Sequence, residues 1–197
     1  MTKQALLTFI KNPEKGKVKT RLAKTVGEEK ALAIYKALLA HTRKIALAIT
    51  TDRFLFYSQH INPADNWSEK DFRKRVQANG DLGVKMQEAF RHVFQTHQKV
   101  VIIGSDCASL TPAIVQTAFE QLDQHDFVIG PALDGGYYLL GMNSFYPAVF
   151  EEITWSTATV LEETLTRIRS IQKSVYLLPA LSDIDYEEDW EKYGWAV

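Results

Sequence analysis

Basic side chains gather in one short segment near the start of the chain. Residues 11–21 read KNPEKGKVKTR and contain a single acid, Glu14, in a chain whose charges otherwise balance. The cations are Lys11, Lys15, Lys17, Lys19 and Arg21. Ammonium groups bind phosphate oxygens, and so do the free N–H groups at the start of a helix. The segment therefore predicts a phosphate-binding loop, with a solvated lysine-rich loop as the alternative.

The same segment excludes two common nucleotide sites. It matches neither GxxxxGK[ST] nor GxGxxG, the glycine patterns of P-loop ATPases and of dinucleotide-binding dehydrogenases. A serine hydrolase is also disfavoured, because the GSDC sequence around Ser105 lacks the GxSxG pattern. Cys107, the single cysteine, is expected to be a buried apolar residue rather than a nucleophile.

Two aspartates stand where a metal-bound diphosphate could be held. Asp106 follows the most apolar run of the chain almost at once, and a carboxylate is a ligand that a hard divalent cation prefers. The alternative for Asp106 is hydrogen bonding to the backbone of its own turn. Asp185 could supply a second carboxylate for Mg²⁺ or Mn²⁺. With Glu188 three residues later, however, it also matches a helix capping box.

A glycine-rich segment, DGGYY, is the third candidate for chemistry. Gly135 and Gly136 would let the backbone approach a ligand closely, and Tyr137 and Tyr138 offer flat stacking surfaces. Asp134 is a candidate for orienting or deprotonating an acceptor. A tight turn between two strands is the alternative for this segment.

Apolar runs and helical spacings alternate along the chain. Strands are predicted at 5–10, 53–57, 99–104, 126–130, 137–141 and 175–178. Helices are predicted at 28–49, 81–97, from Thr111, at 157–171 and after Asp185. This order favours a largely parallel sheet with helices on both faces, and the short connection before Tyr137 favours one antiparallel pair. Ligands of such sheets bind beyond the carboxyl ends of the strands, where the candidate loops lie.

Composition narrows the class of protein. The 197 residues include 23 Lys and Arg against 24 Asp and Glu, for a formal net charge of −1. With 46% hydrophobic residues, a single domain over residues 1–197 is expected. The charge balance argues against a nucleic-acid partner, and one cysteine excludes an internal disulfide. No secretory signal and no apolar run of ~20 residues is visible, so we expect a cytoplasmic protein without a membrane span.

Six segments together resemble a known family. They are KNPEKGKVKTRLA, GDLGVKMQEAF, GSDCASLTP, GPALDGGYYLLGM, ITWST and DIDYEEDW. Their order and spacing are similar to those of the radical-SAM/selenodomain-associated transferase family, in the GT-A-like nucleotide-diphospho-sugar transferase superfamily. The resemblance runs from Leu6 to Trp190 and implies a three-layer α/β/α sandwich with a mixed, mostly parallel sheet. One departure is Ala108-Ser109, where the family usually carries proline and an acid.

The resemblance also implies roles for individual residues. The positions that match the phosphate-contacting loop are Lys11, Gly16, Lys19 and Arg21. Asp106 matches a metal-binding aspartate, and Asp185 matches a late carboxylate that helps to hold the metal. The positions on the nucleotide or acceptor side are Asp81, Gly83, Asp134, Gly135, Gly136 and Tyr137. Helix capping is the alternative for the segment that begins at Asp81.

The implied activity is transfer from a nucleotide-linked donor with Mg²⁺ or Mn²⁺ as cofactor. Lys19 and Arg21 would neutralise the phosphates, and Asp134 would act on a small-molecule acceptor. Glycosyl transfer from a nucleotide-diphospho-sugar is the leading expectation. Nucleotidyl transfer from a nucleoside triphosphate and a non-catalytic nucleotide-sugar binding module stay open, as do the base, sugar, acceptor and oligomeric state.

Overall fold

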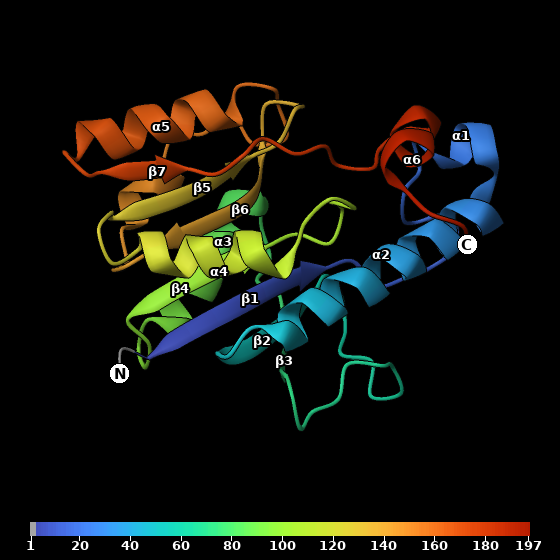
Figure 1. Cartoon of the computed structure of the whole chain (residues 1–197), viewed down its shortest axis with the longest axis horizontal. Helices are drawn as coiled ribbons and strands as arrows, with labels where there is room; N and C mark the ends of the chain where they lie inside the picture. The colour runs from blue at the N-terminus through green and yellow to red at the C-terminus, as the bar shows by residue number, and fades with distance from the viewer. Residues whose placement is uncertain (1–2) are drawn as a thin grey trace.

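A seven-stranded mixed sheet forms the centre of the molecule (Figure 1). The computed structural model describes residues 3–197. The strand order is β3-β2-β1-β4-β6-β5-β7. The strands are β1 (Gln4–Ile10), β2 (Asp52–Tyr57), β3 (Arg73–Val76), β4 (Lys99–Ile103), β5 (Phe127–Pro131), β6 (Tyr137–Met142) and β7 (Val175–Leu177). Strand β6 runs antiparallel to β4 and β5, and the other pairings are parallel. The mixed, mostly parallel sheet is therefore confirmed.

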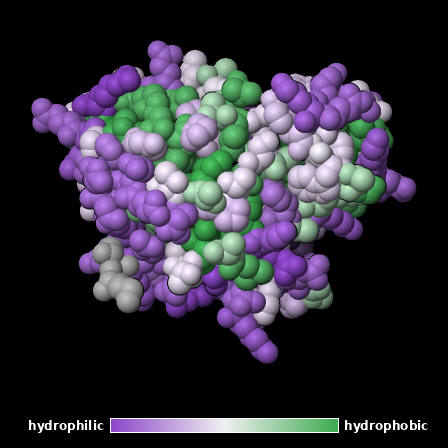
Figure 2. Space-filling model, in the orientation of Figure 1, coloured by the Kyte–Doolittle hydropathy of each residue, from purple (hydrophilic) through white to green (hydrophobic). Residues whose placement is uncertain are grey.

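Helices cover both faces of this sheet. One face packs against α2 (Glu28–Ala48) and α4 (Pro112–Gln121). The opposite face packs against α3 (Leu82–Val93), the 3-10 turn η1 (Pro147–Phe150) and α5 (Val160–Ser170). Seen from the side of α2 and α4, hydrophilic surface surrounds smaller hydrophobic patches (Figure 2).

Strand β1 shows why the apolar run at the amino end is continuous. Leu6 belongs to the core under α2, whereas Leu7 belongs to the core under α3. A strand buried on both faces needs apolar residues at successive positions rather than at alternate ones. The sequence pattern thus identifies β1 and β4 as central strands, which is where the structure has them.

The last part of the chain returns to the beginning. After β7 the chain crosses to α6 (Glu187–Tyr193), which lies beside the short helix α1 (Ala23–Val26) (Figure 1). A third apolar cluster joins these elements and includes Leu22, Ile184 and Trp190. Ala108 is buried in the same cluster, so the residue that departs from the family pattern has a packing role.

Several element boundaries differ from the sequence expectations. Strand β3 was not predicted, because its sequence RKRV has no apolar alternation and its residues are mostly exposed. It pairs with β2 at the edge of the sheet, where charged side chains discourage further strand pairing. Helix α3 ends at Val93 instead of His97, and α5 begins at Val160 instead of Thr157.

Within residues 3–197, no helix has both the length and the hydropathy of a bilayer span. Cytoplasmic localisation and the boundaries of a single domain stay predictions.

Candidate functional site

The loop after β1 delivers Lys19 to the carboxyl edge of the sheet. Gly16 turns the chain with φ of +75°, a conformation that glycine adopts readily. Lys19 itself has φ of +48°, which is uncommon for a residue with a side chain. Its side chain is only 5% exposed, so the ammonium group is held inside the site rather than in solvent.

Three oxygen atoms surround the Lys19 ammonium. Lys19 Nζ lies 2.5 Å from Asp106 Oδ1 and donates a hydrogen bond of 2.7 Å to the carbonyl oxygen of Ile184. Asp185 Oδ1 lies 3.9 Å from the same nitrogen. The contacts bring together the β1 loop, the turn after β4 and the segment before α6. The juxtaposition of basic loop and Asp106 that the sequence analysis requires is present in the structure.

Arg21 and Asp185 form a second ion pair beside the first. Arg21 Nη1 lies 2.9 Å from Asp185 Oδ2. The capping-box interpretation of Asp185 is wrong, because its carboxylate does not cap α6. Asp189 Oδ2 instead accepts hydrogen bonds from the backbone N–H groups of Asp185 and Tyr186. The carboxylate of Asp185 therefore faces the basic loop.

Asp183 is a site residue that the sequence analysis missed. Burial, followed by the negative charge of Asp106, raises the pKa of the Asp183 carboxyl to about 7, although Lys19 acts in the opposite direction. The alternation in Asp183-Ile184-Asp185 was the available signal. Ile184 is fully buried between the two aspartates, and its N–H donates to the carbonyl oxygen of Asp106 at 2.9 Å.

A buried hydroxyl group connects the basic loop to the Asp106 turn. The Tyr35 Oη atom accepts from the N–H of Lys11 at 2.8 Å and donates to the carbonyl oxygen of Lys11 at 3.1 Å. It also lies 3.2 Å from Ser105 Oγ. Helix α2 thus holds both segments in register, while the Lys11 side chain stays exposed.

The DGGYY segment is a tight turn with a packing role. Asp134 Oδ1 accepts a hydrogen bond from the N–H of Gly136 at 3.0 Å. Gly135 has φ of +91° and its α-carbon lies close to the backbone of Ala158. The charge of Asp134 adds to the upward shift of the Asp183 pKa, after burial and Asp106, so Asp134 acts on the same cluster electrostatically.

We expect Gly135→Ala to destabilise the protein strongly. A β-carbon at this position would lie 2.0 Å from the carbonyl oxygen of Ala158, and the positive φ adds strain. Together these effects should lower the free energy of unfolding by about 2–4 kcal/mol. Gly104→Ala is the matched control, because a β-carbon there meets nothing within 4 Å. Urea denaturation would measure both variants, and equal midpoints would contradict this packing role.

The GDLG segment is explained by helix formation and packing. Asp81 Oδ1 caps α3 by accepting a hydrogen bond from the N–H of Val84 at 2.9 Å. Gly83 packs against the ring of Trp155, so the GDLG and ITWST segments contact each other.

The Tyr137 ring packs into the core under α5, and burial raises the pKa of its hydroxyl. Ser156 and Thr157 do not cap α5, whose first residue is Val160.

We call Lys19, Arg21, Asp106, Asp183 and Asp185 the charged cluster. Its chemistry suits a hard divalent cation. Its side-chain acceptors are carboxylate oxygens, the ligands that Mg²⁺ and Mn²⁺ prefer. Burial raises the pKa of the Asp183 carboxyl first, and the negative charge of Asp106 second, so a third carboxyl group lies in the field of this cluster. Among residues 3–197, no group of three His, Cys, Asp or Glu side chains is placed to hold one metal ion. The Lys19 ammonium lies 2.5 Å from Asp106 Oδ1 and 3.9 Å from Asp185 Oδ1. Asp106 and Asp185 thus supply the kind of oxygen ligand that such an ion prefers, and the Lys19 ammonium occupies the position beside them.

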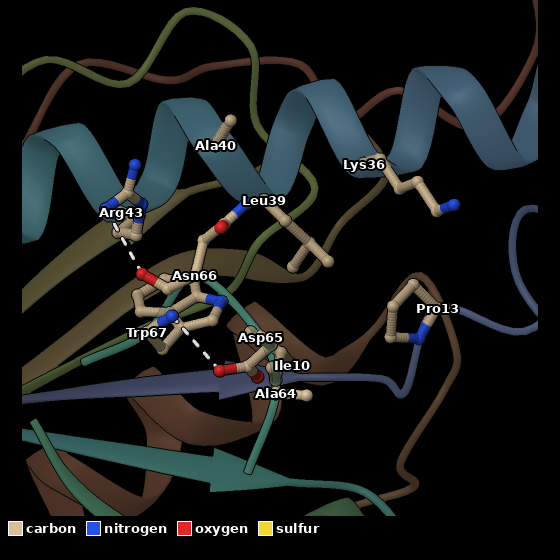
Figure 3. A pocket seen from close by; sticks show the side chains of 10 residues that line it. All are labelled: Ile10, Pro13, Lys36, Leu39, Ala40, Arg43, Ala64, Asp65, Asn66 and Trp67. Atoms are coloured by element: carbon tan, nitrogen blue, oxygen red, sulfur yellow. Dashed lines mark hydrogen bonds between the residues drawn. The ribbon is translucent and has the colours of Figure 1, made fainter. Parts of the chain in front are cut away.

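A cavity near the end of β1 is lined by residues other than those of the charged cluster. This cavity, of about 300 Å³, separates α2 from the turn at residues 64–67 (Figure 3). Ile10 and Leu39 line it, and Arg43 closes one end by donating a hydrogen bond of 3.2 Å to the carbonyl oxygen of Asn66. None of the predicted site residues lines this cavity. The charged cluster is therefore identified by its ion pairs and not by a cavity.

Comparisons with known proteins agree on the fold. The chain is 33% identical to a candidate nucleotide-diphospho-sugar transferase from Desulfovibrio desulfuricans G20, with a TM-score of 0.87 over 94% of this chain and 84% of that one. The inositol-1-phosphate CTP transferase from T. maritima is 12% identical, with a TM-score of 0.61 over 96% and 92% of the two chains. Rv0371c from Mycobacterium tuberculosis H37Rv, solved with manganese, is 14% identical, with a TM-score of 0.57 over the whole of both chains.

The last two similarities show the fold alone, whereas the first extends to the sequence. The similarity to the Desulfovibrio desulfuricans protein supports the GT-A-like superfamily, while the radical-SAM/selenodomain association stays a prediction. No curated protein matches the chain. Residues 39–157 match a family model described as an uncharacterized protein conserved in bacteria, DUF2064. The match spans more than half of the chain, which therefore belongs to the DUF2064 family.

Proposed function

We propose that this protein is a transferase that uses a nucleotide-linked donor and a divalent cation, Mg²⁺ or Mn²⁺. Glycosyl transfer from a nucleotide-diphospho-sugar is the reaction we favour. The carrying observation is the contact of Lys19 with Asp106 at the carboxyl edge of the sheet, next to the Arg21–Asp185 pair. The sequence similarity to a candidate nucleotide-diphospho-sugar transferase supports the same reaction class.

Cations and carboxylates at one edge suit a diphosphate better than they suit a neutral ligand. The basic loop supplies positive charge for phosphate oxygens, and Lys19 and Arg21 are its two members nearest the carboxylates. Asp106 and Asp185 are 40% and 35% exposed, so a ligand can reach them. Groups that are already oriented stabilise charge as it develops, because they need little reorganisation during the reaction.

Asp106 and Asp185 would hold the cation, with Asp183 beside them. A bound divalent cation would supply positive charge to the diphosphate leaving group. Lys19 and Arg21 would contact the same phosphates and balance the charge that grows as the donor bond breaks. Asp134 would orient the acceptor from the turn between β5 and β6, where its charge already acts on Asp183.

The reaction class can be tested with a panel of donors. Nucleotide sugars and nucleoside triphosphates would be incubated with the protein and Mg²⁺ or Mn²⁺, with sugar, alcohol and phosphate acceptors. Release of a nucleoside diphosphate that depends on protein and metal is the expected result. Pyrophosphate release would instead identify a nucleotidyltransferase, and binding without turnover across the panel would identify a binding module.

A further inference from the structure

Lys19 occupies its position in the way a bound cation would. Its ammonium lies against a carboxylate oxygen of Asp106 and the carbonyl oxygen of Ile184, with Asp185 slightly further away. These partners come from two segments that are about 80 residues apart in the sequence. The ammonium therefore joins the turn after β4 to the segment before α6.

Lys19 and Asp106 each stabilise the charge of the other. An almost fully buried ammonium needs a counter-charge, because taking an ion out of water is costly. The Asp106 carboxylate supplies that counter-charge at 2.5 Å, and the Asp185 carboxylate lies 3.9 Å from the same ammonium. The ion pair between Lys19 and Asp106 therefore supplies the counter-charge that the buried ammonium needs.

Arg21 does not share this arrangement. Its side chain is 62% exposed and makes one ion pair, with Asp185. Lys15 and Lys17 pair with Glu29 and Glu14 on the outside of the loop. The ammonium of Lys19 thus lies among the carboxylates, whereas the charges of Lys15, Lys17 and Arg21 lie in exposed ion pairs.

We propose that Lys19 is an internal counter-ion that holds the metal site closed until a divalent cation displaces its ammonium, which then binds the donor diphosphate. The inference rests on the proposed function and adds a regulation to that site. The metal must compete with Lys19 for Asp106, and a free ammonium then favours the diphosphate. The metal ion consequently raises the affinity for the diphosphate, and the diphosphate raises the affinity for the metal ion by the same factor, as linkage requires.

Binding of Mn²⁺ alone gives the first test. Lys19→Met removes the competing charge and keeps an unbranched side chain one atom shorter, so the affinity of the variant for Mn²⁺ should rise at least about tenfold. Electron paramagnetic resonance of free Mn²⁺ would measure the affinity without any substrate. Lys17→Met is the matched control, because Lys17 lies on the same loop but is exposed and pairs with Glu14. Unchanged or weaker Mn²⁺ binding by Lys19→Met overturns the proposal.

Binding of a metal–diphosphate complex gives the second test. Calorimetry with preformed manganese–pyrophosphate should show affinity at least about tenfold lower for Lys19→Met than for wild type. Opposite changes for Mn²⁺ and for the complex are the signature of a displaced counter-ion. An ion pair with a purely structural role would weaken both affinities or neither, and that result also overturns the proposal.

A third measurement uses the wild-type protein and does not depend on how a variant folds. Amine acetylation followed by mass spectrometry should find Lys19 protected in the ligand-free protein and more reactive when Mn²⁺ is added. Lys15 and Lys17 serve as internal controls, whose labelling should not change. If Lys19 stays equally protected at saturating Mn²⁺, the displacement is wrong.

The results separate this inference from the proposed function. Metal-dependent donor turnover with no response of Lys19 to Mn²⁺ would overturn the inference and leave the function standing. Release of Lys19 by Mn²⁺ together with Lys19-dependent binding of manganese–pyrophosphate, but with no donor consumed, would support the inference and overturn the transferase function.

Discussion

Asp106→Asn is expected to abolish metal-dependent donor binding while changing the stability little. The substitution removes the carboxylate that we place on the cation, and losing one member of a close charge pair costs about 2–5 kcal/mol of binding free energy. Folding is affected less, because two changes oppose each other. Lys19 loses its nearest counter-charge, but Asp183 also loses its strongest repulsive neighbour.

A second buried lysine provides a matched control for this experiment. Lys74 is 4% exposed and pairs with Asp65 at 2.9 Å, remote in sequence from the site segments. Asp65→Asn should destabilise the protein and leave metal-dependent donor binding intact. Calorimetric titration and thermal unfolding of both variants would separate the two roles. Equal donor affinity in Asp106→Asn and wild type would remove Asp106 from the site.

Asp183→Asn is expected to change how stability depends on pH. The folded-state pKa of Asp183, about 7, lies above its ordinary value of 3.8 because of burial and the charge of Asp106. Between these values the folded protein keeps a proton that the unfolded chain releases. Wild-type stability therefore falls as pH rises from about 4 to 7. An amide does not titrate, so the variant lacks this fall.

We compare the free energy of unfolding of Asp183→Asn with that of wild type. The difference between the two proteins should shift in favour of the variant by about 2–4 kcal/mol between pH 4 and neutral pH. Urea denaturation at several pH values with a metal chelator present would measure it. Asp71→Asn is a suitable control, since that side chain is exposed and its charge is not among those that shift the pKa of Asp183. Parallel stability curves for Asp183→Asn and wild type would show that Asp183 ionises normally in the folded protein.

The central strands of the sheet could be predicted because burial on both faces requires apolar side chains at successive positions. β1 and β4 are buried on both faces, so their sequences are continuous apolar runs that stand out from the helical spacings around them. β3 could not be predicted in this way. It exists because the edge of β2 offers hydrogen bonds to any extended segment, whatever its side chains.

The site was predicted in part for a similar reason. The basic loop and Asp106 follow central strands, and strand ends in such sheets meet at one edge. Asp183 was missed because its importance comes from burial between segments distant in sequence, which no local pattern records. The capping box of α6 lies one residue later than the sequence pattern predicted, because Tyr186 is the N-cap residue and Asp189 accepts the hydrogen bond from its N–H.

The return of the chain from β7 to α6 also has a consequence during synthesis on the ribosome. Asp183 and Asp185 emerge only after most of the polypeptide has been made, although their partner Lys19 appears among the first residues. Amino-terminal segments generally begin to fold first. Under the proposed function, a nascent chain can therefore engage a donor only after residue 185 has been made, and a fragment that stops short of residue 183 would be inactive even if its sheet had formed.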